Sequence, residues 1–230
     1  QIWTDVDGIM STDPKIVANA KTIPEVSFAE ASEIAYFGAK VLHPKTILPA
    51  MKKNIKVRVL NSFNPKNNGT LILNKTKKNA KSTSTIKAIA CKNKTTLINI
   101  ESTRMLDAYG FLARIFHIFD KYKKGVDAIS TSEVSVSLTV DNGKNLESII
   151  KELSEFSNVN VAKNKSIICV VGEGIKNILG IAGGIFTILS KNNIHIEMIS
   201  MGASEINLTF IVDSKDTEKA VKVLHEGCFE

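Results

Sequence analysis

Two lysines near the start of the chain stand beside residues that restrict the backbone. Lys15 follows Pro14, and Lys40 follows the Gly38-Ala39 end of a predicted helix. A cation held in place can neutralise the charge that develops when a phosphoryl group is transferred. Most lysines, however, are solvated surface charges. By themselves, these two positions therefore favour surface charges over a phosphate site.

A second group of side chains is of the type that binds a small zwitterion. A predicted helix begins at Phe111 after a turn at Gly110, and the free N–H groups and the dipole of a helix start attract a carboxylate. Asp127 and Glu133 flank the strand that we expect next, and their carboxylates can accept hydrogen bonds from ammonium groups. This arrangement suits a free diamino acid. The alternative is that both acidic residues are ordinary capping or surface carboxylates.

The elements that position the two lysines form a mixed α/β pattern, which we call the N-terminal region (residues 1–80). Ser27 and Glu30 have the spacing of a capping box, which predicts that a helix begins at Phe28. The elements expected in this region are a strand end at 2–3, helices at 28–37 and 44–53, a strand at 55–60 and a polar linker at 75–84.

After the linker, the order of predicted elements repeats. The first unit (residues 93–165) has strands at 96–101, 126–131, 134–140 and 159–162 and helices at 111–122 and 146–156. The second unit (residues 166–230) has strands at 167–171, 194–200 and 206–212 and helices at 178–191 and 217–224. The first unit has the β-α-β-β-α-β order of a ferredoxin-like domain, and the second is one strand short.

A strand-like segment at 85–91 precedes the first unit and belongs to neither repeat. A sheet that is one strand short has an unpaired edge beside its helices. We therefore expect residues 84–92 to complete the sheet of the second unit, with the first unit inserted between them.

Three motifs resemble the aspartokinase family, whose members phosphorylate the side-chain carboxylate of aspartate. They are Trp3-Thr4-Asp5-Val6, Phe37-Gly38-Ala39-Lys40-Val41-Leu42-His43-Pro44 and Thr131-Ser132-Glu133-Val134-Ser135. The resemblance extends over essentially the whole chain. It implies an α/β architecture in which the C-terminal part of an amino-acid-kinase fold is followed by two ferredoxin-like ACT domains, the first inserted in the second.

For the N-terminal region, the resemblance implies ATP and Mg²⁺ as cofactors and L-aspartate as the substrate of a complete enzyme. The nucleotide-binding residues that it implies are Thr4, Asp5, Met10, Lys15 and Lys40. Lys15 stands where the family usually has arginine, so a bidentate fork is replaced by a point charge. Met10 stands where an aromatic residue is frequent.

For the first unit, the closest resemblance is to lysine-inhibited aspartokinases, which implies L-lysine as an allosteric effector. The effector-binding residues that we take from it are Met105, Ala108, Gly110, Phe111, Leu112, Gly125, Val126, Asp127, Ser132 and Glu133. Ala108 and Gly125 stand where serine occurs in family members. A hydrogen bond lost at each is worth roughly 0.5–1.5 kcal/mol, so we expect weaker lysine binding or a shifted effector. Such sensors usually pair, so we also expect a homodimer through the ACT domains.

The family's opening Lys-Phe-Gly-Gly motif, its aspartate-binding residues and its catalytic lysine have no counterpart in this sequence. We therefore expect no catalytic residue and no metal ligand in this chain, and no kinase activity from it alone. The alternative is a stand-alone amino-acid sensor without kinase activity. Residues 1–60 argue against that alternative, because a sensor has no use for the kinase-type motifs.

The net charge of +7 raises nucleic acid as a partner, since residues 34–100 contain thirteen lysines and Arg58 but no Asp or Glu. Arginine forks and stacking aromatics are scarce in this stretch, and we expect no nucleic-acid partner. No apolar run approaches the ~20 residues that span a bilayer, so we expect no membrane partner. The three cysteines form no CxxC pair, which favours free thiols and a cytoplasmic location.

Overall fold

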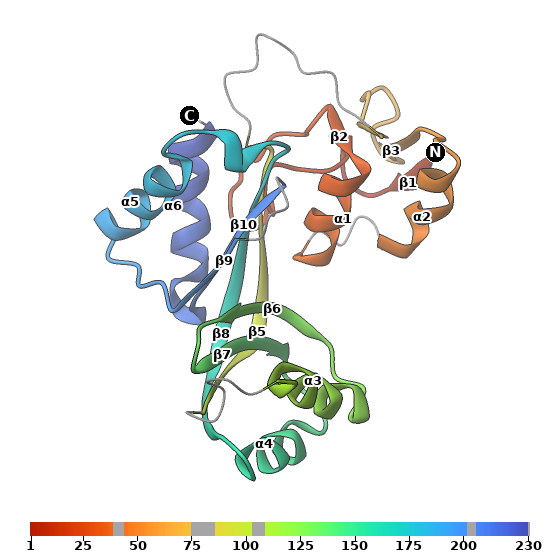
Figure 1. Cartoon of the computed structure of the whole chain (residues 1–230). Helices are drawn as coiled ribbons and strands as arrows, with labels where there is room; N and C mark the ends of the chain where they lie inside the picture. Colours follow the sequence, from red (N-terminus) through yellow and green to blue (C-terminus); the bar gives the residue numbers. More distant parts are fainter. Residues whose placement is uncertain (39–43, 75–85, 103–108, 202–205, 230) are drawn as a thin grey trace.

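The computed structural model describes residues 1–38, 44–74, 86–102, 109–201 and 206–229. Its strands form two sheets, a small one in the N-terminal region and a larger one shared by the first and second units. The N-terminal region and the second unit lie at one end of two long strands, and the first unit lies at the other end (Figure 1). The architecture is mixed α/β, as predicted.

The small sheet has the strand order β1-β3-β4-β2. The elements of the N-terminal region are β1 (Ile2–Thr4), β2 (Glu25–Ser27), α1 (Phe28–Tyr36), α2 (Pro44–Lys52), β3 (Val57–Asn61) and β4 (Thr70–Leu73). The predicted capping box is confirmed, because Ser27 Oγ accepts from the Glu30 N–H at 3.1 Å while Glu30 Oε2 accepts from the Ser27 N–H at 2.8 Å. Helix α1 therefore has a fixed start.

The larger sheet is antiparallel and has the order β6-β7-β5-β8-β10-β9. The elements around it are β5 (Ala88–Glu101), α3 (Phe111–Lys121), β6 (Val126–Thr131), β7 (Ser135–Asp141), α4 (Leu146–Ser154), β8 (Asn158–Val171), η2 (Ile175–Asn177), α5 (Ile181–Lys191), β9 (Met198–Ser200), β10 (Asn207–Asp213), η3 (Ser214–Asp216) and α6 (Thr217–Phe229).

Strands β5 and β8 are each continuous over 14 residues. The sequence had indicated separate strands at 85–91 and 96–101, and again at 159–162 and 167–171. The polar residues between them stay in the ladder, which passes through a register shift near Lys92 and Thr95. Lys94 and Asn164 have positive φ angles of 61° and 58° there. Such bulges increase the local twist of a strand, so each strand turns from one unit into the other without ending.

The pairing predicted for the segment before the first unit is confirmed. Ala88 pairs with Val171, and Lys92 pairs with Ile167. The first half of β5 is thus the missing fourth strand of the second unit, next to the second half of β8. The first unit is inserted in the second, and the predicted unit limits at 92/93 and 165/166 fall inside continuous strands.

Two other predicted elements differ in extent. The helix expected at 178–191 begins three residues later, as α5 at Ile181, because Gly180 before it has a left-handed φ of 78° that does not continue a helix. The strand expected at 194–200 is reduced to β9 at its last three residues.

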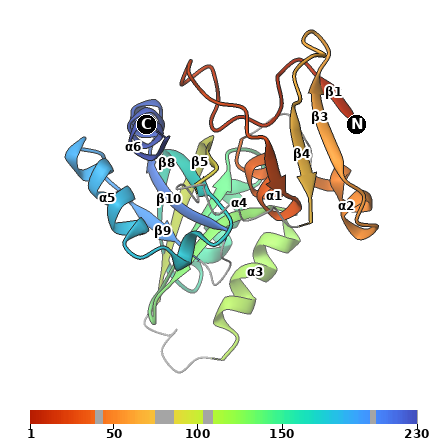
Figure 2. The ribbon, with the colours of Figure 1, turned by 90° about the horizontal axis from the view of Figure 1, so that it is seen from above.

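Alternate residues of the second unit's strands face two different helix layers. Ile168, Val170 and Phe210 pack with α5 and α6, whereas Cys169 and Ile211 pack with helix α1 of the N-terminal region. Figure 2 shows α1 and the pair α5 and α6 on either side of these strands. The sheet of the second unit is therefore buried on both faces, which explains its continuous apolar sequence.

The first unit has its own core, between its part of the sheet and helices α3 and α4. Ile98 and Ile100 of β5 face these helices, together with Leu138 of β7. The residues that alternate with them include Asn99 and Ser137, which are half-buried and bonded to each other at 2.9 Å. This half of the sheet has one apolar face and one polar face.

The end of the chain packs back on its beginning. His225 of α6 is buried, and its Nε2 lies 2.9 Å from Ser11 Oγ, while the Ser11 carbonyl accepts from the Ile89 N–H at 2.7 Å.

Within the described part of the chain, no helix has the length and apolarity to cross a membrane. The cysteines Cys91, Cys169 and Cys228 are free thiols.

Candidate functional site

The first two predicted nucleotide residues lie at the carboxyl edge of the small sheet. Strand β1 runs parallel to β3, so Thr4 pairs with Asn61 at the same edge, and ligands of open α/β sheets bind at such edges. Thr4 Oγ1 donates to Asp5 Oδ1 at 3.1 Å. The Thr4 carbonyl accepts from the Ser62 N–H at 2.8 Å, which fixes the two loops together.

Sequence reasoning missed three polar neighbours at this edge. Asn61 Nδ2 donates to Asp7 Oδ1 at 2.7 Å, and Asn64 Nδ2 lies 3.3 Å from the same oxygen. The signal that could have found them is positional, because Asp7 and Asn64 each follow the end of one of two strands that a parallel sheet places side by side.

The remaining predicted nucleotide residues come from segments that follow β1. Met10 forms an isolated bridge with Thr22, and Lys15 is exposed, with its N–H bonded to Asp13 Oδ1 at 2.9 Å. In the described part of the chain, no hydrogen bond joins Met10 or Lys15 to the Thr4 loop. Lys40 lies outside the described residues.

The predicted carboxylate site at the start of α3 is accessible. Gly110 caps the helix with a φ of 80° and is exposed. Phe111 is half-buried against Phe156, with ring centroids 5.7 Å apart, and Leu112 is partly exposed. Met105 and Ala108, which the resemblance assigns to the preceding loop, lie outside the described residues.

Ser132 and Glu133 form the exposed turn between β6 and β7. Ser132 Oγ accepts from the Ser135 N–H at 3.1 Å, which makes the turn tight, and the Glu133 side chain is free to face solvent. Gly125 is exposed directly before β6. A cavity of about 650 Å³ opens next to this turn, lined by Glu101, Ser102, Val134, Ser135, Ser154, Glu155, Phe156, Ser157 and Asn158.

An irregularity in the register of β6 places the predicted effector residues Val126 and Asp127 on different sides of the sheet. Its pairing with β7 shifts between Val126 and Ile129, and both of these side chains pack toward α3 and α4. Ala128 instead belongs to the core around α1. Asp127 turns to the α1 side as well, away from the α3 layer where Val126 packs.

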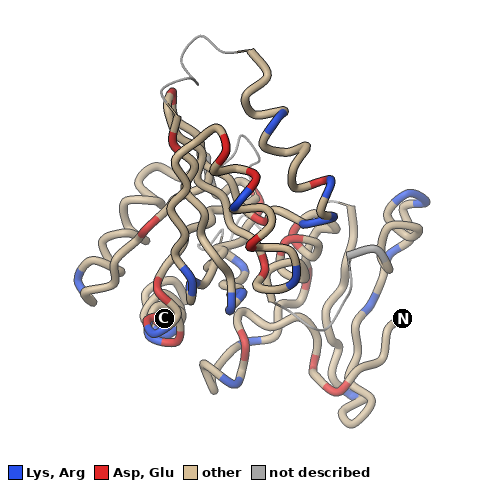
Figure 3. The backbone as a smooth tube through the Cα atoms, turned by 90° about the horizontal axis from the view of Figure 1, so that it is seen from below, with Lys and Arg blue, Asp and Glu red and all other residues tan. Residues whose placement is uncertain are grey.

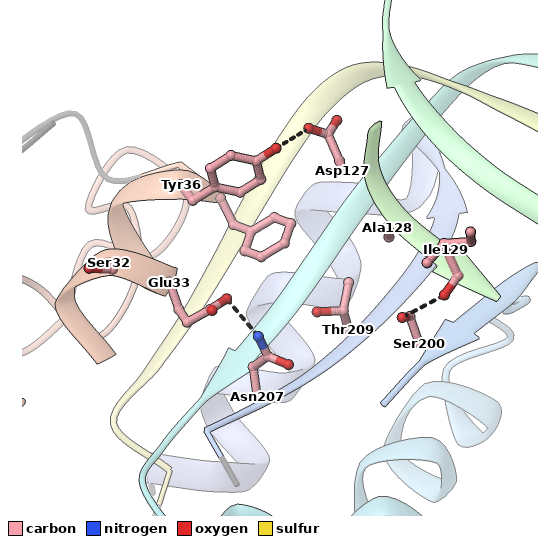
Figure 4. Close-up of a pocket in the computed structure, with 10 residues that line it drawn as sticks. Ser32, Glu33, Tyr36, Asp127, Ala128, Ile129, Ser200, Asn207 and Thr209 are labelled. Atoms are coloured by element: carbon pink, nitrogen blue, oxygen red, sulfur yellow. Dashed lines mark hydrogen bonds between the residues drawn. The ribbon is translucent and has the colours of Figure 1, made fainter. Parts of the chain in front are cut away.

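Figure 4 shows that Asp127 faces the end of α1. Its Oδ1 accepts from the Tyr36 hydroxyl at 2.7 Å and from Lys92 Nζ at 2.8 Å. Partial burial, followed by the hydrogen bond to Asp127, raises the pKa of Tyr36 above its ordinary value. Burial alone would lower the pKa of Lys92, but its bonds to Asp127 and Asp141 outweigh burial and raise it.

A cavity of about 450 Å³ lies beside these groups, between α1 and the sheet. It is lined by Ser32, Glu33, Tyr36, Phe37, Asp127, Ala128, Ile129, Ser200, Asn207 and Thr209 (Figure 4). Of the predicted effector residues that the structure describes, Asp127 lines this cavity. Sequence reasoning missed Tyr36 and Lys92, and no local pattern could have paired Tyr36 with a residue 91 positions away.

Charged residues of both signs are spread over the three parts of the molecule. Figure 3 shows Lys and Arg on the N-terminal region and on both units, with Asp and Glu between them. Several lysines are engaged with carboxylates, such as Lys87 with Glu30 and Lys165 with Glu197. Part of the positive charge is therefore neutralised by ion pairs within the protein.

Two family models match the chain in separate segments. Residues 1–61 match the amino acid kinase family, and residues 168–227 match the ACT domain. The matched segments correspond to the N-terminal region and to the second unit.

Related proteins match over the full chain. It is 41% identical to Aspartokinase 3, chloroplastic, of Arabidopsis thaliana and 42% identical to Lysine-sensitive aspartokinase 3 of Escherichia coli, in both cases over 100% of this chain. It covers 42% and 51% of these relatives, so it spans about half of their length. A structure of a C-terminal regulatory domain of aspartate kinase from Porphyromonas gingivalis is 37% identical, with a TM-score of 0.55, and is covered over 97% of its length and 62% of this chain.

The chain belongs to the aspartokinase family. Within this family, two crystal structures of E. coli aspartokinase III, both 41% identical over 100% of this chain, give a finer comparison. The complex with aspartate and ADP (R-state) has a TM-score of 0.89 with 52% of that chain covered, and the complex with lysine and aspartate (T-state) has a TM-score of 0.84 with 51% covered. The arrangement described here is thus closer to the ADP complex.

Proposed function

We propose that this chain supplies the regulatory part and one side of the nucleotide site of an ATP-dependent aspartate kinase that L-lysine inhibits. The observation that carries the proposal is the match over the whole chain to E. coli aspartokinase III, in which the N-terminal region and both units superpose together. The reaction would transfer the γ-phosphoryl group of ATP to the side-chain carboxylate of L-aspartate and give 4-phospho-aspartate and ADP.

In this proposal, the carboxyl edge of β1 and β3 faces the nucleotide. Thr4 and Asp5 would hold it, while Lys15 and Lys40 would offset the negative charge of the phosphates. Mg²⁺ would arrive with ATP and neutralise phosphate oxygens. We assign it no protein ligands in this chain.

The first unit would bind L-lysine. The start of α3 at Gly110 and Phe111 would receive the carboxylate, and Asp127 and Glu133 would receive ammonium groups. A homodimer would form through the ACT domains. Leu112, Phe116 and Val134 support this, since each exposes about two fifths of its surface on the first unit (39%, 38% and 41%).

A chimaera tests the kinase proposal. The matching C-terminal half of E. coli lysine-sensitive aspartokinase 3 is replaced by residues 1–230 of this chain, and ADP formation with ATP and L-aspartate is measured with and without L-lysine. Aspartate-dependent ADP formation that L-lysine inhibits supports the proposal. A folded chimaera that makes no ADP, while the isolated chain still binds lysine, would favour a sensor without kinase activity.

Calorimetric titration of the 230-residue chain tests the effector separately. We expect saturable binding of L-lysine, weaker binding of L-threonine and loss of lysine binding in Asp127→Ala. Sedimentation of the same sample reports whether the chain is a dimer, and a monomer that binds lysine fully would contradict the assembly proposed here.

A further inference from the structure

Helix α1 is tied to the larger sheet by three polar side chains spaced three residues apart. Glu30, Glu33 and Tyr36 share one helix face because of this spacing. Glu33 Oε2 accepts from Asn207 Nδ2 at 2.6 Å, and the Tyr36 hydroxyl donates to Asp127 Oδ1 at 2.7 Å. The helix therefore contacts both units, with Tyr36 reaching the first unit.

The contact at the start of α1 is closed to exchange. Glu30 is fully buried, and its Oε2 accepts from Lys87 Nζ at 3.1 Å while its Oε1 accepts from the Glu173 N–H at 2.8 Å. Both carboxylate oxygens are occupied, so removing a donor would leave a buried charge without compensation.

The contact at the other end of α1 is incomplete. The Asp127 side chain is only 4% exposed, and Oδ1 receives both of its donors, Tyr36 and Lys92. Its Oδ2 is buried and has no hydrogen-bond partner among the described residues. A carboxylate can accept about four hydrogen bonds, so Asp127 would gain from a donor-rich group such as an ammonium.

Both present partners of Asp127 can leave it and still have another hydrogen-bond partner. Lys92 Nζ also binds Asp141 Oδ1 at 2.8 Å, and that carboxylate is 60% exposed. Tyr36 is 47% exposed, so water can replace its bond to Asp127. The cavity of about 450 Å³ beside the ring gives it room to move.

We propose that the ammonium group of the amino-acid effector displaces the Tyr36 hydroxyl from Asp127, which releases the C-terminal end of helix α1 from the first unit. This inference rests on the proposed function, in which L-lysine binds the first unit. Tyr36 is then a positioning residue: it holds the end of α1, directly before Phe37 and Gly38 and the stretch that contains Lys40. One carboxylate serves either the effector or the kinase-type helix.

Fluorine NMR on the whole chain tests this exchange. The chain has three tyrosines, so 3-fluorotyrosine labelling gives three signals, and Tyr36→Phe identifies the one from Tyr36. We expect the Tyr36 signal to shift during a titration with L-lysine, with the same midpoint as the calorimetric titration. Tyr36→Phe should bind L-lysine about three- to tenfold more tightly, because the competing donor to a charged acceptor is gone.

The matched control is Tyr122→Phe, which removes a hydroxyl that lies near Glu152 rather than Asp127 and should leave lysine affinity unchanged. Saturable lysine binding with no shift of the Tyr36 signal, and equal affinity in Tyr36→Phe, would overturn the exchange and leave the proposed effector intact. No lysine binding by the folded wild-type chain would overturn the proposed effector, and the exchange with it.

Discussion

The first and second units share two strands, yet the face of the sheet opposite their own helices differs between them. In the second unit this face presents Cys169, Val171 and Ile211, which are fully buried against α1. In the first unit it presents Asn99 and Ser137, which are polar and half-buried. The same pair of strands is thus covered on both faces at one end and on one face at the other.

This difference teaches which unit is fixed and which can respond. The second unit forms a common core with the N-terminal region, so movement between them would expose apolar surface. The first unit meets α1 mainly where Asp127 and Ala128 turn toward it. A ligand in the first unit can therefore change that contact without opening the core of the second.

The largest expected effect breaks the apolar face of the second unit. Cys169→Asp places a carboxylate in the core between the sheet and α1, and we expect the free energy of unfolding to fall by more than about 4 kcal/mol. Ser137→Asp, at the corresponding face of the first unit, should cost about 1 kcal/mol or less. Urea denaturation followed by circular dichroism measures both. Similar losses in the two variants would contradict the comparison.

Glu30→Ala tests the closed end of the α1 contact. The change removes the side-chain half of the capping box, which accepts from the Ser27 N–H, and leaves Lys87 without its carboxylate, so we expect a loss of about 2–4 kcal/mol in the free energy of unfolding. Glu33→Ala removes one bond to Asn207 at a half-buried site and should cost about 1 kcal/mol. An equal cost for the two substitutions would mean that burial does not determine how much each contact of α1 contributes to stability.

Tyr36→Phe tests the exchangeable end. The substitution keeps the ring and removes one hydrogen bond, so we expect a loss of about 0.5–1.5 kcal/mol in the free energy of unfolding. Tyr109 is fully exposed, and Tyr109→Phe serves as the control with no measurable loss. A cost for Tyr36→Phe as large as that of Glu30→Ala would argue against an easily exchanged contact.

The smallest expected effect concerns alkaline pH. The pKa values of Tyr36 and Lys92 are raised in the folded protein, so their contribution is fully present below about pH 10, their ordinary range, and is lost as pH rises above it. Burial raises the pKa of Cys91 to about 11, which acts in the same direction. The stability of Tyr36→Phe should fall less steeply than that of the wild type above about pH 10. Parallel curves would contradict the role of the phenol.

Much of the fold follows from local patterns in the sequence. The capping box at Ser27 fixed the start of α1, and the alternation around β6 and β7 predicted those strands closely. The need for a fourth strand in the second unit predicted that residues 84–92 join its sheet, and the pairing of Ala88 with Val171 confirms this. Caps and periodicity can be predicted because they depend on residues close in the sequence. The unpaired sheet edge could be predicted because the second unit has one strand fewer than the first.

What the sequence could not predict depends on tertiary packing. The polar residues near Lys94 and Asn164 suggested strand ends, but β5 and β8 continue through them because neighbouring strands supply the pairing. The irregularity in β6 decides on which face of the sheet Asp127 lies, and no residue type at 126–129 predicts this irregularity. The contact between Asp127 and Tyr36 depends on how the N-terminal region packs on the sheet, so the sequence alone does not indicate it.

The sharing of β5 and β8 has a practical consequence for expressing parts of this protein. No contiguous fragment yields the second unit with all four of its strands but without the first unit, because the second unit needs residues from both sides of the first. A fragment that begins at residue 166 would be expressed with an open edge on β8, prone to pair with other copies. Dissection of this protein therefore requires excising residues of the first unit and rejoining the flanks with a short turn between the halves of β5 and β8.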